Sequence, residues 1–232
     1  MKNIFEIKPI AHIRTDFPSK FGIPRQSGMV ESLEGTIVFE PEYRNRESLR
    51  GLENYSHLWL IWGFSETVCD DWLPTVRPPR LGGNIRMGTF ATRSPFRPNP
   101  IGLSCVRLEK IRSYTSSGPE IQVSGIDMMD GTPIFDIKPY LPYTDCRPDA
   151  TGGFTENIQK RVLQVHVASE LLNRIPFDKQ KTLLSTLSLD PRPSYQNDSD
   201  RIYGFLFSDF EIKFSVKEQE IYVVDILPLK AK

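Results

Sequence analysis

The sequence predicts a mainly β protein, with a larger β-rich domain over residues 1–150 and a small α+β domain over residues 151–232. In the first 150 residues, short strand-like runs are separated by long loops marked by Pro and Gly, with almost no helical periodicity. One amphipathic helix and several alternating runs follow after about Phe154. Hydrophobic residues make up 39% of the chain and charged residues 25%, which is ordinary for a globular protein. The first domain is therefore expected to be a β-sandwich or a β-barrel.

The first domain contains six expected strands. They cover residues 8–14, 34–39, 57–64, 87–90, 103–111 and 121–125, and a short helical turn is expected over 47–51. The run 57–64 is apolar on both faces, which is typical of a strand buried on both sides or of a stave in a barrel. In the run 103–111 the apolar phase slips between Cys105 and Val106, which predicts a β-bulge there. The run 121–125 alternates apolar and polar side chains and leads directly to Asp127.

The second domain combines one helix with alternating strands. A strand is expected over 162–167. Asp178 is a candidate N-cap for a helix that carries Leu183, Leu184 and Leu187 on one face. Residues 210–217 alternate in the period of two of a half-buried strand, and a turn joins them to a partner strand over 221–227.

Several classes of protein do not fit the composition. The longest uninterrupted apolar run covers residues 58–62, far short of the roughly 20 residues of a membrane span, and no apolar stretch at the N-terminus indicates a signal peptide. The three cysteines are far apart and form no CxxC pair, so we expect free thiols and a cytoplasmic protein. No histidine lies at metal-ligand spacing from a cysteine, and we expect no metal site.

Residues 77–112 concentrate positive charge in a chain whose formal net charge is +0. The basic residues there are Arg77, Arg80, Arg86, Arg93, Arg97, Arg107, Lys110 and Arg112, and the only acid is Glu109. Prolines at 95, 98 and 100 hold this loop in a preset shape, which lowers the entropy lost when it binds a partner. Arginine suits a phosphate or carboxylate that must be held in fixed geometry. Two interpretations stay open: ion pairs with the aspartates of residues 127–149, or a polyanion site.

Two further segments are candidates for a binding site. In the segment 124–140 a strand leads to Asp127, the turn at Asp130 follows, and Asp136 and Lys138 share one face if the chain is extended. This is either a solvent-facing hairpin or a strand end whose carboxylate holds ribose hydroxyls or an ammonium group. The loop 24–28 is either a connector or part of the same site. Since the sequence has neither a strand–GxGxxG–helix unit nor a P-loop, any nucleotide-like cofactor requires a different architecture.

Five strings of the sequence together resemble the TsaA-like (TrmO) family of tRNA methyltransferases. They are KFGIPRQSG, RGLENYSHLWLIW, PTVRPPRLGGNIRMGTFATRSPFRPNPIGLS, IDMMDGTPIFDIKPYLPY and DPRPSYQ, and they extend from residue 20 to residue 196 in the order of the family. The resemblance implies a single-sheeted β-barrel that carries an S-adenosylmethionine site, a small C-terminal domain and a homodimer. It also implies the activity: methylation of the threonylcarbamoyl-modified adenosine beside the anticodon of tRNA.

The resemblance also implies a set of cofactor-binding residues. By matching position they are Gln26, Ser27, Gly28, Arg93, Leu103, Ser124, Gly125, Ile126 and Asp127. The family often has a His or Gln pair after the apolar strand, where this sequence has Ser65 and Glu66, so this part of the site departs from the pattern. The string DPRPSYQ has Ser194 where the family has Ala, which is a small change.

The implied reaction needs further groups. Because the acceptor nitrogen shares its lone pair with a carbamoyl group and a purine, we expect a general base. The nearby candidates are Asp127, Asp130 and Asp136, and assistance by the substrate's own carboxylate is equally open. We expect Arg77, Arg80, Arg86, Arg97 and Lys138 to bind the RNA, with Arg93, Arg97 or Lys138 also available for the substrate's carboxylate and with Phe96 or Tyr140 available to stack on a base. The alternatives are a non-catalytic RNA-binding module and a small-molecule enzyme that grips an anionic substrate.

Overall fold

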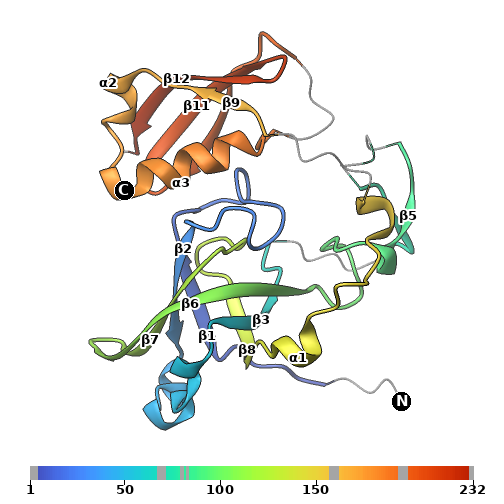
Figure 1. Ribbon diagram of the computed structural model, residues 1–232, viewed down its shortest axis with the longest axis vertical. Coiled ribbons are helices and arrows are strands. Elements are labelled where there is room, and N and C mark those ends of the chain that lie inside the picture. Colours follow the sequence, from blue (N-terminus) through green and yellow to red (C-terminus); the bar gives the residue numbers. More distant parts are fainter. Residues whose placement is uncertain are drawn as a thin grey trace. The chain divides into compact units, whose positions relative to one another are not determined.

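The computed structural model describes residues 5–66, 72–78, 81, 84–156, 162–192 and 198–229. The chain forms two compact units, each assembled from separate stretches of the sequence. The first contains residues 1–15, 26–72 and 95–140, and the second contains residues 16–25, 73–94 and 141–232. Figure 1 labels most of their helices and strands.

The first unit is a closed β-barrel. Its six strands are β1 (Ala11–Thr15), β2 (Glu34–Phe39), β3 (His57–Gly63), β6 (Ile101–Thr115), β7 (Gly118–Ser124) and β8 (Pro133–Pro139). Around the barrel they follow the order β1-β2-β7-β6-β3-β8, and every neighbouring pair is antiparallel. Closure leaves no edge strand to be protected. The predicted mainly β fold with a barrel is confirmed.

The strand β3 shows why its sequence is apolar on both faces. Leu58, Leu60 and Trp62 point into the barrel and are at most 6% exposed. The alternate side chains, such as Trp59 and Ile61, face outward and are half-buried. A barrel stave whose outer face is also partly covered therefore gives an unbroken apolar run.

The long strand β6 corrects the predicted position of the bulge. Its pairing with β3 is continuous past Cys105 and Val106, so a bulge between these two residues is wrong. The irregularities lie further along, between Leu108 and Lys110 and between Arg112 and Thr115, in the pairing with β7. The apolar alternation of residues 103–111 gave the wrong position because the polar Ser104 points into the barrel, while Leu103 points outward with 53% of its surface exposed.

Short 3-10 helices fill the connection between β2 and β3. They are η1 (Pro41–Tyr43), η2 (Arg46–Leu49) and η3 (Leu52–Asn54), and the side chain of Asn45 accepts a hydrogen bond from the backbone of Glu47 at the start of η2. This agrees with the helical turn predicted over 47–51. Leu49 is the buried residue of this connection.

The second unit contains a four-stranded sheet and short helices. The strands β4 (Thr75–Val76) and β5 (Met87–Gly88) form a separate two-stranded sheet. The other elements are η5 (Thr89–Ala91), α1 (Pro142–Asp145), η6 (Gly153–Thr155), β9 (Gln164–His166), α2 (Ser169–Leu172), α3 (Phe177–Ser188), β10 (Tyr203–Phe207), β11 (Phe210–Lys217) and β12 (Glu220–Pro228). The larger sheet has the order β10-β11-β12-β9, with β9 parallel to β12, and α3 crosses one face of it (Figure 1). The predicted small α+β domain is present in this unit, although the unit also recruits residues 16–25 and 73–94.

Two details of this unit differ from the prediction. The helix α3 begins at Phe177 with Pro176 as its N-cap, so Asp178 lies within the first turn and not at the cap. An acid in the first turn still favours the helix through its dipole. The strand β10 was missed, because Gly204 interrupts its apolar run and the strand follows directly on a polar loop.

Aromatic rings form the core of the second unit. Phe17, Phe207 and Phe214 are fully buried, and Phe205 is 2% exposed. On the helical side, Leu183 and Leu187 of α3 are buried together with two threonines one turn apart. Among the described residues, no helix is long and apolar enough to cross a membrane, and no cluster of side chains has the composition of a metal site.

The close packing of Trp62 against Gly102 can be tested by substitution. A Cβ at this position would lie 2.2 Å from Cε2 of Trp62, a buried ring on the neighbouring strand. We expect Gly102→Ala to lower the free energy of unfolding by about 1–3 kcal/mol, because the indole must shift within a packed barrel. Urea unfolding measures the change. Gly88→Ala is the control, since nothing lies within 4 Å of its Cβ position; equal unfolding curves for the two variants would contradict the packing of Trp62.

Candidate functional site

A glycine turn beside the end of β7 is the first part of the candidate site. Gly28 and Gly125 both have positive φ angles, +76° and +74°, which glycine adopts without strain. The Gly28 N–H donates to the carbonyl of Gly125 at 2.8 Å, and the Gly125 N–H donates to the carbonyl of Leu33 at 2.9 Å. The structure thus brings the predicted segments 26–28 and 124–127 together. Nothing lies within 4 Å of the Cβ position of Gly28, so a ligand can approach its backbone closely.

A chain of three side chains is the second part. The buried Trp62 Nε1 donates to Ser104 Oγ at 2.9 Å, and Ser104 Oγ donates to Asp127 Oδ1 at 2.6 Å. Ser104 is fully buried and Trp62 is 6% exposed, whereas Asp127 is half-buried. The barrel core therefore fixes the orientation of one carboxylate immediately after the end of β7. A buried hydroxyl between an indole and a carboxylate fits this role because it both accepts and donates a hydrogen bond.

The other two aspartates have structural partners. Asp130 is exposed, and its carboxylate accepts a hydrogen bond from the Thr15 N–H at 2.9 Å. Asp136 pairs with Lys138 at 2.8 Å on the outer face of β8 and accepts from the Ile137 N–H at 2.9 Å. Of the three candidate bases, Asp127 is the one whose carboxylate accepts a hydrogen bond from a buried side chain of the described barrel, that of Ser104.

The Asp136–Lys138 contact also bears on the predicted RNA-binding role of Lys138. The hydrogen bond that Lys138 donates to the Asp136 carboxylate raises the pKa of the lysine above its ordinary value of 10.5, so its charge is lost only at higher pH. Lys138 is exposed and remains cationic at neutral pH. Ion pairing with an aspartate was one of the two interpretations of the basic residues, and Lys138 forms such a pair.

The remaining predicted cofactor residues differ in accessibility. Ser124 is 5% exposed, and its hydroxyl donates to Glu109 at 2.6 Å. Ile126 is fully buried, so its side chain can support a ligand only indirectly. Leu103 is exposed on the outer face of β6, the opposite face from Ser104, and the structure does not bring its side chain to Asp127. Ser65 and Glu66 are exposed just after β3.

The basic residues are distributed over both units. Arg77, Arg86 and Arg93 belong to the second unit and are exposed, and the guanidinium of Arg86 donates to Thr75 Oγ1 at 3.0 Å. Arg97, which is half-buried, belongs to the first unit together with Lys138. Arg80 lies outside the described residues.

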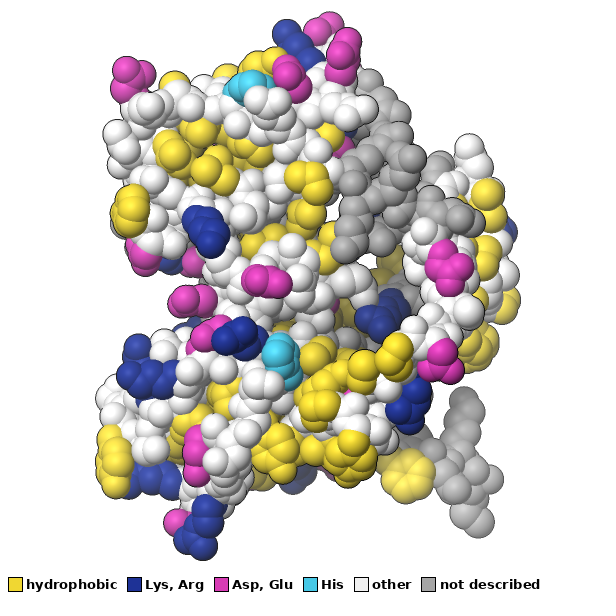
Figure 2. All heavy atoms as spheres, in the orientation of Figure 1, with side chains coloured by type: hydrophobic (Ala, Val, Ile, Leu, Met, Phe, Trp, Pro, Cys, Tyr) yellow, Lys and Arg dark blue, Asp and Glu magenta, His cyan; other side chains and the backbone are white. Residues whose placement is uncertain are grey.

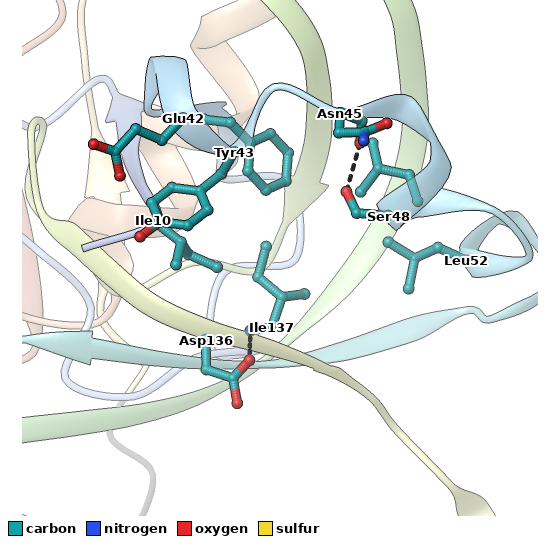
Figure 3. A pocket seen from close by; sticks show the side chains of 10 residues that line it. Ile10, Glu42, Tyr43, Asn45, Ser48, Leu52, Asp136 and Ile137 are labelled. Carbon is teal, nitrogen blue, oxygen red and sulfur yellow. Dashed lines mark hydrogen bonds between the residues drawn. The ribbon is translucent and has the colours of Figure 1, made fainter. Parts of the chain in front are cut away.

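A cavity of about 310 Å³ lies in the first unit (Figure 3), and none of its lining residues belongs to the glycine turn. Its lining comes from the three 3-10 helices η1, η2 and η3, from Ile10 and Phe39, and from Asp136 and Ile137 of β8. None of the predicted cofactor residues and none of the predicted basic residues lines it. It therefore gives no support to a small-molecule enzyme that grips an anion with these arginines.

The outer wall of the barrel carries apolar side chains on β6 and β3, and Figure 2 shows hydrophobic side chains gathered over this part of the barrel. The Asp136–Lys138 ion pair of β8 lies beside them. Ile101 and Leu103 are exposed there, at 36% and 53%. Tyr140 lies 5.8 Å, centroid to centroid, from Trp59.

Sequence reasoning missed Ser104, Trp62 and Glu109. All three form hydrogen bonds between strands: Trp62 and Ser104 belong to paired strands, and Glu109 accepts a hydrogen bond from Ser124 across the β6–β7 pair. A polar residue at an inward position of β6 was the available signal for Ser104, because buried polar groups take hydrogen-bond partners.

Comparisons with known proteins agree over both parts of the chain. The model of the tRNA-methyltransferase O N-terminal domain matches residues 12–146, and that of the TrmO C-terminal domain matches residues 154–229. The tRNA (adenine(37)-N6)-methyltransferase of Escherichia coli is 37% identical over 232 residues, covering 97% of this chain and 98% of that protein. The protein of the same name from Eikenella corrodens is 42% identical over 166 residues, 71% of this chain and 93% of that protein.

A solved structure is similar over nearly the whole chain. The crystal structure of TrmO from Pseudomonas aeruginosa has a TM-score of 0.78 at 31% identity, and the match covers 98% of this chain and 99% of that one. The barrel and the C-terminal sheet are thus a shared architecture.

Proposed function

This chain belongs to the tRNA-methyltransferase O (TrmO) family, and we propose on that premise that it is an S-adenosylmethionine-dependent methyltransferase that acts on adenosine 37 of tRNA, next to the anticodon. The observation that carries the proposal is the match to both domain models over nearly the whole chain. The acceptor is the threonylcarbamoyl-modified form of this adenosine. We divide the chain at about residue 150, with residues 1–150 binding the cofactor and catalysing the reaction and residues 151–232 forming the C-terminal domain.

The cofactor site is built on the glycine turn. Gln26, Ser27 and Gly28 form the turn, and a ligand can approach its backbone at Gly28. Gly125, just after β7, is hydrogen-bonded to Gly28, and Asp127 follows two residues later. When bound, S-adenosylmethionine supplies a methyl group on a sulfonium. Asp127 offers an oriented carboxylate for ribose hydroxyls or for a cationic group, and Ser124 and Ile126 support the strand end from within. Arg93, Leu103, Ser65 and Glu66 complete the set implied by family resemblance.

Asp127 is also the best candidate for the general base. The acceptor nitrogen is a weak nucleophile, so removing its proton as the new bond forms lowers the barrier. Ser104 holds Asp127 in one orientation, which reduces the cost of aligning it with the acceptor. Asp130 and Asp136 are weaker candidates, because their carboxylates cap a backbone N–H and pair with Lys138.

The tRNA is held by basic residues. Arg77, Arg80, Arg86, Arg97 and Lys138 supply charge for phosphates, and the exposed Phe96 is available to stack on an unpaired base. The protein is cytoplasmic, where its tRNA substrate is found, and it acts as a homodimer. The apolar outer wall of the barrel supports a second copy as its partner, and analytical ultracentrifugation measures that state.

Salt dependence tests the RNA contacts. We expect the logarithm of tRNA affinity to fall with the logarithm of salt concentration, with a slope of about −0.7 per phosphate neutralised. Arg77→Ala and Arg86→Ala should each make that slope less negative by about 0.7, because each removes one phosphate contact. Fluorescence anisotropy at several salt concentrations measures it. Arg50→Ala is the control, since Arg50 is an exposed arginine already paired with Glu47; a flat salt response of the wild type would contradict the proposed contacts.

Calorimetry separates this function from its alternatives. The purified protein should bind S-adenosylmethionine in the absence of tRNA, whereas a non-catalytic RNA-binding module on the same barrel should not. A protein that binds tRNA but gives no heat with S-adenosylmethionine would exclude the methyltransferase and leave the binding module.

A further inference from the structure

The loop that precedes the glycine turn is packed into the C-terminal sheet. Phe17 is fully buried, with its ring centroid 5.6 Å from that of Phe207 and 6.5 Å from that of Phe205. Gly22, at φ +95°, lies against the Phe205 ring so closely that a Cβ there would sit 2.4 Å from Cδ2. The loop, which covers residues 16–25, therefore belongs to the core of the second unit although it follows directly on β1.

Polar contacts hold the same loop at both ends. The backbone carbonyl of Asp16 accepts from the Ser208 N–H at 2.6 Å. The Asp16 carboxylate pairs with Lys179 of α3, whose ammonium group also donates to Ser208 Oγ at 3.0 Å. At the far end, Arg25 donates to the carbonyl of Arg192 at 3.3 Å.

The glycine turn begins where this loop ends. The chain passes from the second unit to the first between Arg25 and Gln26. The next fixed point is Gly28, whose N–H donates to the Gly125 carbonyl. Only Gln26 and Ser27 lie between the two anchors, and successive Cα atoms are about 3.8 Å apart, so the link from the loop to the glycine turn is short.

We propose that the C-terminal domain sets the affinity for S-adenosylmethionine through this loop, with Lys179 and Phe17 as positioning residues. The inference deepens the proposed function and rests on it, since it assumes that the turn at residues 26–28 holds the cofactor. Releasing the loop lowers the fraction of molecules in which the turn has its binding conformation. The apparent dissociation constant then rises in inverse proportion to that fraction.

Lys179→Met in the full-length protein tests the coupling without opening the aromatic core. Calorimetry should show S-adenosylmethionine bound about tenfold more weakly if the ordered turn falls to about one tenth of the population. The KM for S-adenosylmethionine should rise while kcat at saturation is retained. Arg174→Met is the matched control: it breaks the 2.9 Å ion pair with Asp225 in the same domain and does not touch residues 16–25. It should bind the cofactor as the wild type does.

A double-mutant cycle with Asp16→Asn makes the test specific. Because Lys179 and Asp16 act through one contact, the double variant should bind no more weakly than either single variant. Unchanged affinity of Lys179→Met, or an equal loss in Arg174→Met, would overturn the inference alone. A wild-type protein that does not bind S-adenosylmethionine would overturn the inference and the proposed function together.

Discussion

Asp127→Asn is expected to lower kcat for methyl transfer by about 10²- to 10⁴-fold, the range typical of a lost general base. The amide is nearly isosteric and still accepts the hydrogen bond from Ser104, so the barrel should fold as in the wild type. What it lacks is the charge and the basicity of the carboxylate. Single-turnover kinetics with saturating S-adenosylmethionine and modified tRNA measures the chemical step. Circular dichroism and thermal unfolding check that the fold is retained.

Two matched variants separate Asp127 from its neighbours. Asp130→Asn and Asp136→Asn remove carboxylates that bond to the Thr15 backbone and to Lys138, and both should keep the wild-type kcat. A rise in KM for S-adenosylmethionine in Asp127→Asn without a fall in kcat would assign the residue to cofactor binding only. Unchanged kinetics would favour assistance by the substrate's own carboxylate.

Gly125→Val is expected to weaken S-adenosylmethionine binding by about 10- to 100-fold, because overpacking costs about 1–3 kcal/mol and each 1.4 kcal/mol is a tenfold change in affinity. A Cβ at Gly125 would already lie 3.5 Å from the Cα and N of Gly28, so the two methyl groups of valine press directly on the glycine turn. The turn must move, and its hydrogen bond to the Gly125 carbonyl is broken or distorted. Calorimetry with S-adenosylmethionine measures the effect.

Gly131→Val controls for backbone strain. Gly131 has a φ of +77°, so a side chain costs about 1–2 kcal/mol there as it does at Gly125. Nothing lies within 4 Å of its Cβ position, however, and no part of the candidate site is displaced. We expect similar losses of thermal stability in both variants and a loss of cofactor affinity in Gly125→Val alone. Equal affinities would remove the glycine turn from the site.

The periodic parts of the fold could be predicted from the sequence. The expected strand 34–39 has the same bounds as β2, and the expected strand 210–217 has the same bounds as β11, because strict alternation follows from one buried and one exposed face. The resemblance to the TrmO family supplied the closed barrel, which periodicity alone left open against a sandwich. The bulge in β6 was misplaced because the inward residue is Ser104, whose burial depends on a tryptophan of another strand.

The candidate site could be predicted only in part. The segments 26–28 and 124–127 were nominated by resemblance, and the structure joins them through one backbone hydrogen bond. The choice among the aspartates needed the hydrogen bond from Ser104, which links positions 23 residues apart. The packing of the loop held by Phe17 and Lys179 could not be predicted either, because a contact between residues 163 positions apart leaves no local pattern in the sequence. The roles of the nominated residues stay predictions until variants are measured.

Mass spectrometry of tRNA nucleosides from a strain that lacks the gene tests the central claim most directly. The methylated form of threonylcarbamoyladenosine should disappear, while its unmethylated precursor persists. A plasmid with the wild-type gene should restore it, and one with Asp127→Asn should not. A methylated nucleoside that stays at its normal level without the gene would contradict the assignment.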